Sequence, residues 1–401
     1  MKLSVIIVSY NVKHFVEQCI LSVLKSAVDI STEIYVVDNL SSDDTVSYLK
    51  KAFPIEHYPT IHIIANQENV GFGRANNQAL AISEGEYVLF LNPDTILTET
   101  TLSDCLTFAE THALLGGVGV RMQRPDGRFA LESRRGLPTP FTSFCKMTGL
   151  SSLFPKSRLL GRYYMRYLKE NEAAEIDVVS GAFFFVSRKA LAQNGAFDED
   201  FFMYGEDIDL SFRLKKAGLK NYYLPTPILH YKGESTEKTS YRYVRVFYEA
   251  MLIFFNKHYR HYSFLFSCSV CVAIYVRAFI AFVWQQLHKL CAFFQKKNRT
   301  ESIVYTFLGC EEMLRQAQTI CFENKITSNY RTVHDGSDLS SVFKTVLKKG
   351  TLHYIVLDTE VFSYQSILNL FEKYAHPRIS IGTYSLKTHV LVTDYFTYKN
   401  E

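Results

Sequence analysis

Apolar residues in the first quarter of the chain form short runs that alternate with longer amphipathic stretches. The short runs are rich in Val, Ile and Leu, as strands covered on both faces of a sheet are. The longer stretches repeat apolar positions every three or four residues, which predicts helices. This alternation indicates a parallel sheet wound by right-handed crossovers. We expect strands at residues 3–9, 33–38, 61–65 and 87–91, and helices at residues 14–26, 43–53 and 73–83.

Polar residues gather where these predicted strands end. Because ligands of parallel sheets bind beyond the carboxyl ends of the strands, one rim of the sheet is the expected binding site. Several polar strand ends on one rim favour a site for a nucleotide or a metal ion. The residues concerned are Ser9, Tyr10 and Asn11, then Asp38 and Asn39, then Asn69 and Arg74 at the start of the third helix, then Asn92, Pro93 and Asp94.

The alternation weakens after residue 100. Less regular strands are expected at residues 114–121, 127–133, 178–187 and 221–224, and residues 134–169 are basic, aromatic and without a clear pattern. A helix is expected from Leu210 to Ala217, with Gly218 as its C-terminal cap.

Three carboxylates stand within four positions of the segment Gly205–Leu210. Like charges so close repel one another, so the cluster is costly unless a base, a metal or a cationic partner uses it. Glu206 and Asp207 are therefore expected at a working site. Asp209 has a simpler role available, because Arg213 lies four residues further along the same helix face and can form an ion pair with it.

Composition excludes several classes of protein. With 401 residues, of which 47% are hydrophobic, the chain can form real cores. A net charge of +4 with basic residues spread along the chain argues against a nucleic-acid partner. Eight cysteines form no spaced disulfide framework, and the pair Cys268 and Cys271 has no second pair or nearby His to complete a zinc site. Lys2 is followed by only a short apolar run, so no secretory signal is expected and the first domain is predicted to be cytoplasmic.

A long apolar run extends from Ser263 to Trp284 and is interrupted by one charge, Arg277. Its length matches a membrane span, and basic residues flank both of its ends. A charge near the centre of a span is expensive, however. Three interpretations stay open: a transmembrane helix, a helix lying in the membrane interface, and a helix buried in a protein core.

The last hundred residues predict a small α/β unit. Strands are expected at residues 303–309, 352–358, 378–384 and 389–392, with helical patterns up to Phe322 and around residues 367–374. A single glycine, Gly309, follows the first of these strands, and the G-x-G-x-x-G pattern that cradles phosphates is absent. A packing or protein-contact role is therefore favoured over nucleotide binding. We expect three regions, at residues 1–245, 246–299 and 300–401.

Five segments together resemble the family 2 glycosyltransferases of the GT-A fold, and are most similar to their rhamnosyltransferase-like branch. The resemblance covers roughly residues 1–240 and implies a GT-A nucleotide-diphospho-sugar transferase fold, an α/β architecture with a Rossmann-like mixed sheet and flanking helices. The hydrophobic helical segment and the C-terminal α/β unit would follow it. The matching segments are Ser4–Asn11, Val36–Asn39 with Ser41 and Asp43, Asn69–Asn77, Leu91–Asp94 and Gly205–Leu210.

For the sugar donor, the resemblance implies that Asp38 binds the base or the ribose and that Arg74 meets the diphosphate. Asp94 would hold Mg²⁺ or Mn²⁺, with His230 reaching the metal or the diphosphate. The family often has Asp-x-Asp where this chain has Asn92-Pro93-Asp94, so metal affinity is expected to depend on the donor diphosphate. The other residues implied in donor binding are Ser9, Tyr10, Asn11, Asn39, Asn69 and Asn92.

For the acceptor, the resemblance implies that Asp207 is the general base and that Glu206 orients the base or an acceptor hydroxyl. A single displacement by a base-activated hydroxyl inverts the anomeric centre. The expected function is therefore inverting transfer of a sugar from a nucleoside-diphosphate donor to a hydroxyl of a lipid-linked saccharide or polysaccharide, in cell-surface glycan assembly. The expected location is the cytoplasmic face of the plasma membrane, as a peripheral or single-span protein.

Two alternatives remain. A polyprenyl-phosphate sugar synthase would share the N-terminal half, but its phosphate acceptor would need no general base. A sugar-nucleotide-binding scaffold would keep the fold without turnover, which the intact carboxylates of Asp38, Asp94 and Asp207 argue against.

Overall fold

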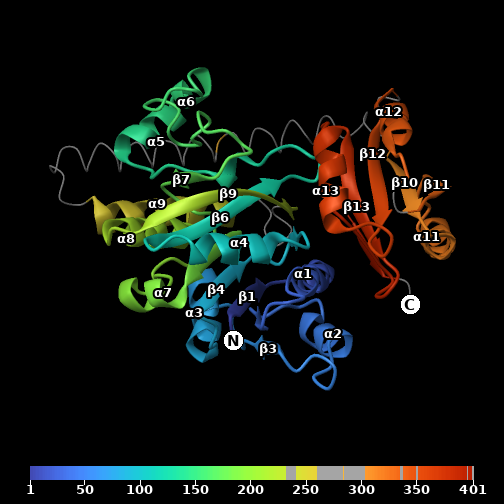
Figure 1. Ribbon diagram of the computed structural model, residues 1–401, viewed down its shortest axis with the longest axis horizontal. Coiled ribbons are helices and arrows are strands. Elements are labelled where there is room, and N and C mark those ends of the chain that lie inside the picture. Colours follow the sequence, from blue (N-terminus) through green and yellow to red (C-terminus); the bar gives the residue numbers. More distant parts are fainter. Residues whose placement is uncertain are drawn as a thin grey trace.

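The chain forms two α/β units, seen in Figure 1 as a blue-to-yellow part and an orange-to-red part. Within the described residues the first unit has a nine-stranded sheet and the second a six-stranded sheet. The apolar run Ser263–Trp284 lies outside the described residues except for Val283. This computed structural model describes residues 1–231, 241–259, 283, 303–334, 337–348, 351–394 and 396–399.

The N-terminal half of the first sheet is parallel, as predicted, in the order β3-β2-β1-β4. Every residue of β1 is buried, and its side chains alternate between two cores: Val5 and Ile7 pack on one face of the sheet, Ile6 and Val8 on the other. That double burial explains the continuous apolar run. The elements are β1 (Leu3–Ser9), α1 (Lys13–Ser26), β2 (Thr32–Asp38), α2 (Thr45–Ala52), β3 (Ile61–Ala65), α3 (Phe72–Ile82) and β4 (Tyr87–Leu91).

The carboxyl ends of these strands share one edge. Ser9 is in register with Asp38, and Ile7 with Leu91, so the polar residues that follow β1, β2 and β4 meet there. The predicted rim is confirmed.

The other half of the sheet is mixed. Antiparallel β8 lies between β4 and β6, and β9 pairs with β6 in parallel and with β5 and β7 in antiparallel fashion. The strands are β5 (Thr95–Leu97), β6 (Leu115–Gln123), β7 (Ala174–Ile176), β8 (Phe183–Ser187) and β9 (Lys220–His230).

Two predicted strands in this half are corrected. Residues 127–133 hold only an isolated bridge at Phe129 and a 3-10 turn, η1 (Leu131–Ser133), instead of a strand. At this turn the Ser133 hydroxyl accepts the Met122 N–H at 2.9 Å in place of a strand carbonyl. The strand predicted at residues 178–187 begins only at Phe183. Upstream of it, the N–H groups of Val179 and Gly181 donate to Ser211 Oγ and Asp207 Oδ2 on the acidic helix, at 3.1 and 2.9 Å.

The acidic helix α8 (Glu206–Lys216) begins four residues earlier than predicted, so the carboxylate cluster lies in its first turn. Gly218, with φ of +87°, follows its end as predicted. The helix after it, α9 (Tyr241–His258), runs across the boundary predicted at residue 245 and packs Phe254 and Phe255 beside Phe201. The remaining helices of this unit are α4 (Thr101–Glu110), α5 (Pro140–Met147), α6 (Leu150–Leu153) and α7 (Arg188–Asn194).

The second unit has the strand order β11-β10-β12-β13-β14-β15, with the first four strands parallel. Its four predicted strands and both predicted helices are confirmed. The exposed β11 and the elements α12 and β15 were not expected. The bounds are β10 (Ile303–Gly309), α11 (Glu311–Glu323), β11 (Ser328–Thr332), α12 (Ser340–Lys348), β12 (Leu352–Asp358), α13 (Tyr364–Lys373), β13 (Ile379–Ser385), β14 (Val390–Thr393) and β15 (Thr397–Lys399).

Helix α13 docks the second unit onto the first (Figure 1). The Glu99 carboxylate accepts the N–H groups of Tyr364 and Gln365 at 2.8 and 3.0 Å, at the start of α13. Further along the helix, Glu372 forms an ion pair of 2.8 Å with the buried Arg121 of β6. Apolar side chains of both units belong to one buried cluster. In the parts of the chain that the structure describes, no helix has the length and apolar character of a membrane span.

Candidate active site

The loops after β1 and β2 are joined by hydrogen bonds at the strand edge. The buried Asp38 carboxylate accepts the N–H and the hydroxyl of Ser41, at 2.9 and 2.5 Å. Asn11, in the left-handed region with φ of 56°, accepts the Ser42 N–H at 2.7 Å through its side-chain oxygen. Ser41 thus holds the Asp38 carboxylate in place at the edge of the sheet. Beside these residues, Tyr10 is partly exposed and Ser9 Oγ is buried without a hydrogen-bond partner in the described structure.

Asn39 and Asn69 hold the loop that leads into α3. The Asn39 amide donates to Asn69 Oδ1 at 3.0 Å, and its oxygen accepts the Val70 N–H at 3.1 Å. At the following Gly71, φ is +87° and a Cβ would lie 2.6 Å from the Phe202 carbonyl, so only glycine fits. Both asparagines therefore have a framework role beside the predicted donor pocket.

Arg74 has a different partner from the one expected. Its Nε donates to Glu199 Oε2 at 3.0 Å, and its side chain is 52% exposed. The structure thus places it in a surface ion pair at the start of α3, and contact with a diphosphate would require it to leave Glu199.

Asp94 and His230 are brought together by strand pairing. Thr95 of β5 is in register with His230 of β9, and Asp94 Oδ1 lies 3.4 Å from His230 Nε2. The Asn92 amide is 3.5 Å from the same imidazole nitrogen, and both Asp94 and His230 are buried. The proximity was implied by resemblance alone, because the two residues are far apart in the sequence.

A carboxylate oxygen and an imidazole nitrogen are both ligands for a divalent cation, so this pair fits the predicted metal role. His230 Nδ1 is buried and has no hydrogen-bond partner in the described structure. Among the described residues, no three His, Cys, Asp or Glu side chains are grouped to hold a metal. If Asp94 and His230 hold a metal, these two ligands would leave most coordination positions to oxygens of the donor diphosphate.

Asp207 is held from two sides. The Arg135 guanidinium donates to Asp207 Oδ2, which also accepts the Gly181 N–H at 2.9 Å. Burial acts to lower the pKa of Arg135, but the charge and the hydrogen bond of Asp207, together with Tyr163 and Glu132, outweigh burial, and the net shift of this pKa is upward. Arg135 was not singled out in the sequence analysis. It lies in the basic stretch 134–169, where nothing local distinguishes it from its neighbours.

Glu206 lies beside this pair, but among the described residues its carboxyl group lacks the cationic partner that Asp207 has. It is buried, and its Oε2 has no hydrogen-bond partner in the described part of the chain. Burial, together with the adjacent Asp207 charge, raises the pKa of Glu206 to about 8. At neutral pH Glu206 is therefore a neutral acid that can donate a hydrogen bond, next to an Asp207 carboxylate that can accept one.

Asp209 is a structural residue. Its Oδ2 accepts from Arg213 Nε at 2.7 Å, which confirms the predicted ion pair. Its Oδ1 lies 2.6 Å from His258 Nε2 of α9. The carboxylate thus joins α8 to α9, and its partners on both sides are side chains of these two helices.

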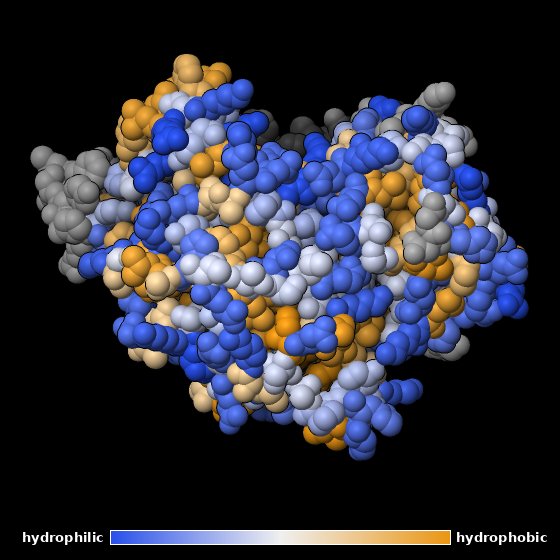
Figure 2. Space-filling model, in the orientation of Figure 1, coloured by the Kyte–Doolittle hydropathy of each residue, from blue (hydrophilic) through white to orange (hydrophobic). Residues whose placement is uncertain are grey.

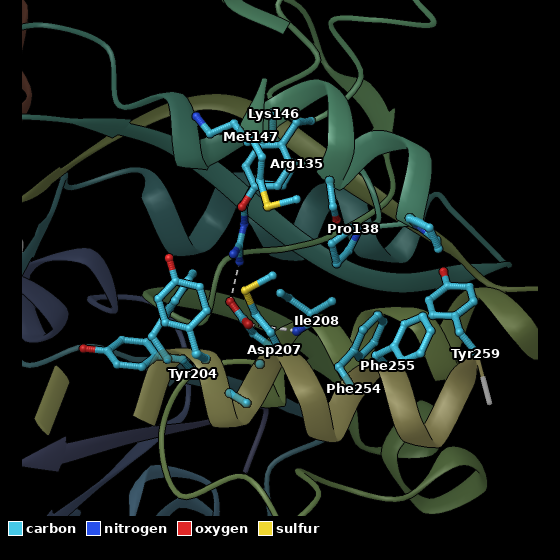
Figure 3. Close-up of a pocket in the computed structure, with 18 of the residues that line it drawn as sticks. Arg135, Pro138, Lys146, Met147, Tyr204, Asp207, Ile208, Phe254, Phe255 and Tyr259 are labelled. Atoms are coloured by element: carbon cyan, nitrogen blue, oxygen red, sulfur yellow. Dashed lines mark hydrogen bonds and ion pairs between the residues drawn. The ribbon is translucent and has the colours of Figure 1, made fainter. Parts of the chain in front are cut away.

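A cavity of about 770 Å³ opens beside Glu206 and Asp207 (Figure 3). One wall comes from α5 and the residues before it, and the opposite wall comes from α9. Figure 3 shows Arg135 pointing across the cavity to Asp207, with Phe254 and Phe255 beyond it on the α9 wall. The irregular stretch 134–169 thus supplies part of the cavity wall, including Arg135 itself.

The sequence of this chain is similar to those of known glycosyltransferases. The family model described as Glycosyl transferase family 2 matches residues 4–195. An N-acetylglucosaminyl-diphospho-decaprenol L-rhamnosyltransferase of Mycobacterium tuberculosis is 27% identical over 264 residues, which cover 63% of this chain and 83% of that protein. Rhamnosyltransferase WbbL of Escherichia coli is 27% identical over 237 residues, covering 57% of this chain and 82% of that one.

Solved structures of low sequence identity also align. A mannosyltransferase from Pyrobaculum calidifontis in complex with GDP-Man and Mn²⁺ has a TM-score of 0.46 and 15% identity, with 80% of each chain covered. Residues 1–349 of TarS from S. aureus in complex with UDP have a TM-score of 0.41 and 20% identity, with 65% of this chain and 73% of that one covered.

Proposed function

Because this chain belongs to glycosyl transferase family 2 through residues 4–195, we propose that it is an inverting enzyme that transfers a sugar from a nucleoside-diphosphate donor to an acceptor hydroxyl. The acceptor we propose is a lipid-linked saccharide or a polysaccharide of the cell surface. The relatives support this choice, since two are named rhamnosyltransferases and one of these is named for an N-acetylglucosaminyl-diphospho-decaprenol acceptor.

The observation that carries the proposal is the position of the Asp207 carboxylate on the cavity wall. An acceptor hydroxyl has a high pKa and must lose its proton as it attacks, so the base must be ionised and accessible. Arg135 and the Gly181 N–H hold the Asp207 carboxylate in place, and the side chain lines the cavity. The neutral Glu206 beside it can donate a hydrogen bond to an acceptor oxygen and orient it.

The donor would lie along the strand edge, with Asp38 binding its base or ribose. Asp94 and His230 would hold a divalent ion, Mg²⁺ or Mn²⁺, together with the diphosphate. When bound, that ion would neutralise the charge of the departing diphosphate. Attack from the side of Asp207 displaces the nucleotide in one step and inverts the anomeric carbon.

The two alternatives predict different behaviour. A polyprenyl-phosphate sugar synthase would need no base, so loss of the Asp207 carboxylate would have little effect on its turnover. A scaffold would bind a nucleotide sugar and release no nucleotide. The Asp207 and Arg135 pair beside a large cavity favours hydroxyl transfer over both.

A screen of nucleotide sugars by thermal unfolding, with and without Mn²⁺, tests the donor. A cognate donor at ~100 times its dissociation constant stabilises the folded state by about 2.7 kcal/mol, enough for a clear shift in Tm. We expect one class of nucleotide sugar to raise Tm in Mn²⁺ and to do so less in chelator. If no nucleotide sugar raises Tm, and none is hydrolysed or transferred, the assignment fails.

For the location we propose the cytoplasmic face of the plasma membrane, as a peripheral or single-span protein. The proposal rests on the apolar sequence Ser263–Trp284 and its basic flanks. A lipid-linked acceptor in the same bilayer would then meet the enzyme in two dimensions, which raises its effective concentration.

A further inference from the structure

The cavity beside Asp207 is polar at one side and apolar over most of its walls. Arg135, Glu206 and Asp207 form the polar side. Aromatic and aliphatic side chains dominate α5 and α9, among them Met147 on the first helix and Met251 and Phe254 on the second. Sugar hydroxyls placed along these walls would lose their hydrogen bonds to water, which is unfavourable, whereas a hydrocarbon chain would gain by leaving water.

The apolar lining continues onto the outer surface. Phe141 and Phe144 of α5 line the cavity and are also 47% and 52% exposed. Close by in sequence, Leu153 and Phe154 at the end of α6 are exposed as well. Figure 2 shows this hydrophobic surface as an orange area over α5 and α6. An exposed apolar patch joined to an apolar cavity is typical of an entry site for an apolar ligand.

Lys146 supplies a cation on the same helix. Its ammonium lies 3.9 Å from the ring centroid of Tyr164 and 5.2 Å from that of Tyr163. Within the described residues it makes no ion pair with a carboxylate, so its charge is available to an anion. Figure 3 shows Lys146 and Met147 on the wall opposite Asp207. A cation on the cavity wall opposite the Asp207 carboxylate suits the phosphate that links a lipid to a saccharide.

We propose that the cavity between α5 and α9 holds the apolar chain of a lipid-linked acceptor, with its phosphate linker at Lys146 and its saccharide at Asp207. The inference rests on the proposed function and narrows its acceptor from two classes to one, the lipid-linked saccharide. A free polysaccharide has no segment that matches the α5 and α9 walls. A volume of about 770 Å³ has room for the first few isoprenoid or methylene units next to the phosphate, and the rest of the chain would leave past Phe141 and Phe144.

The test is equilibrium binding of farnesyl diphosphate to the full-length protein by calorimetry, with inorganic diphosphate as the probe that lacks the chain. We expect farnesyl diphosphate to bind and inorganic diphosphate to bind at least tenfold more weakly. Met251→Trp fills the cavity and should weaken farnesyl diphosphate binding by about tenfold or more, a loss of about 1.4 kcal/mol. The control Phe322→Trp changes a side chain of α11 that is 88% exposed and should bind like wild type.

A second variant separates loss of binding from loss of folding. Phe141→Ser with Phe144→Ser alters exposed positions at the mouth and should also weaken farnesyl diphosphate binding, with Tm close to that of wild type. Equal binding of both probes, or wild-type affinity in Met251→Trp and in the double variant, would overturn the inference. Donor binding, measured by the Tm shift with nucleotide sugar, should stay unchanged in every variant. Loss of donor binding in wild type with farnesyl diphosphate binding intact would instead count against the proposed function alone.

Discussion

The Arg135 guanidinium binds the Asp207 carboxylate, and only 18% and 11% of these two side chains are exposed. Arg135 lies in an irregular segment before α5, and Asp207 lies in the first turn of α8. Exclusion of water strengthens such a pair and fixes the orientation of the carboxylate. The carboxylate of Asp207 therefore lines the cavity with its position set before any substrate binds.

Asp207→Asn should lower the rate of sugar transfer by about 10²–10⁴-fold, the usual contribution of a general base. Donor affinity should change little, because the base acts on the acceptor hydroxyl. Product formation and nucleotide-sugar binding are to be measured on the same preparation, with Tm as a check on folding. Transfer within about tenfold of wild type would exclude Asp207 as the base and favour a phosphate acceptor.

Glu206→Gln should change how stability depends on pH. The pKa of Glu206 is about 8 in the folded protein, above the ordinary value of 4.5, so the folded state holds a proton that the unfolded chain releases. The wild-type free energy of unfolding should therefore lose this contribution as pH rises from about 4.5 to about 8. Glutamine cannot ionise, so the variant should gain stability relative to wild type between pH 5 and pH 9.

Denaturant unfolding at several pH values measures this effect, and Glu56→Gln, at an exposed position, serves as the control with the wild-type slope. Glutamine still donates a hydrogen bond, so transfer at pH 7 should persist within about tenfold of wild type. Parallel pH curves for wild type and Glu206→Gln would show that Glu206 is ionised in the folded protein.

Asp94→Ala and His230→Ala should each weaken Mn²⁺-assisted binding of the donor diphosphate. We expect a loss of at least the ~10–100-fold that removal of an outer-shell metal partner costs. Calorimetric titration of the nucleoside diphosphate, with Mn²⁺ and with chelator, separates the metal contribution from direct contacts. Asp29→Ala, at an exposed position in the first unit, is the matched control. If both variants bind like wild type under both conditions, the metal assignment is wrong.

Glu372→Ala should loosen the second unit from the first. The variant leaves the buried Arg121 guanidinium without its carboxylate partner, which costs about 1–3 kcal/mol of stability. Glu312→Ala removes a carboxylate from a largely exposed pair with Arg315 and should cost less than about 1 kcal/mol. Denaturant unfolding and limited proteolysis between the units measure the difference. Equal effects of the two substitutions would show that the α13 contact contributes little.

The full-length protein should sediment with membranes and stay in the pellet after a high-salt wash, because of the apolar run from Ser263 to Trp284. Arg substitutions within Leu265–Val276, such as Leu265→Arg with Val272→Arg, should release it, since a charge in the apolar phase costs several kcal/mol. Phe322→Arg on α11 is the control. Wild type that is soluble without detergent would show that the run is not an anchor.

Sequence patterns predicted the parts of this protein whose cause is local. The parallel strands β1 to β4 are continuous apolar runs because both faces of that sheet are covered. Their carboxyl ends share an edge because the strands are parallel. The pair of Asp209 and Arg213 followed from helical spacing alone. The motifs around Asp38, Asp94 and Asp207 were recognised because each keeps its residues within a few positions.

Tertiary structure decided what depends on contacts between distant segments. The pairing of β5 with β9 brings His230 to Asp94, and the docking of an irregular segment on α8 brings Arg135 to Asp207. Most of α9 lies in the sequence region 246–299, which was predicted to be a separate hydrophobic segment. In the structure, α9 packs against the first unit and forms one wall of the cavity. Side-chain periodicity reports only which face of an element is buried, so the sequence determined the sheet edge and its chemistry. Packing decided which residues meet at that edge, such as His230 with Asp94. No local sequence pattern specifies which distant segment will pack against a given face.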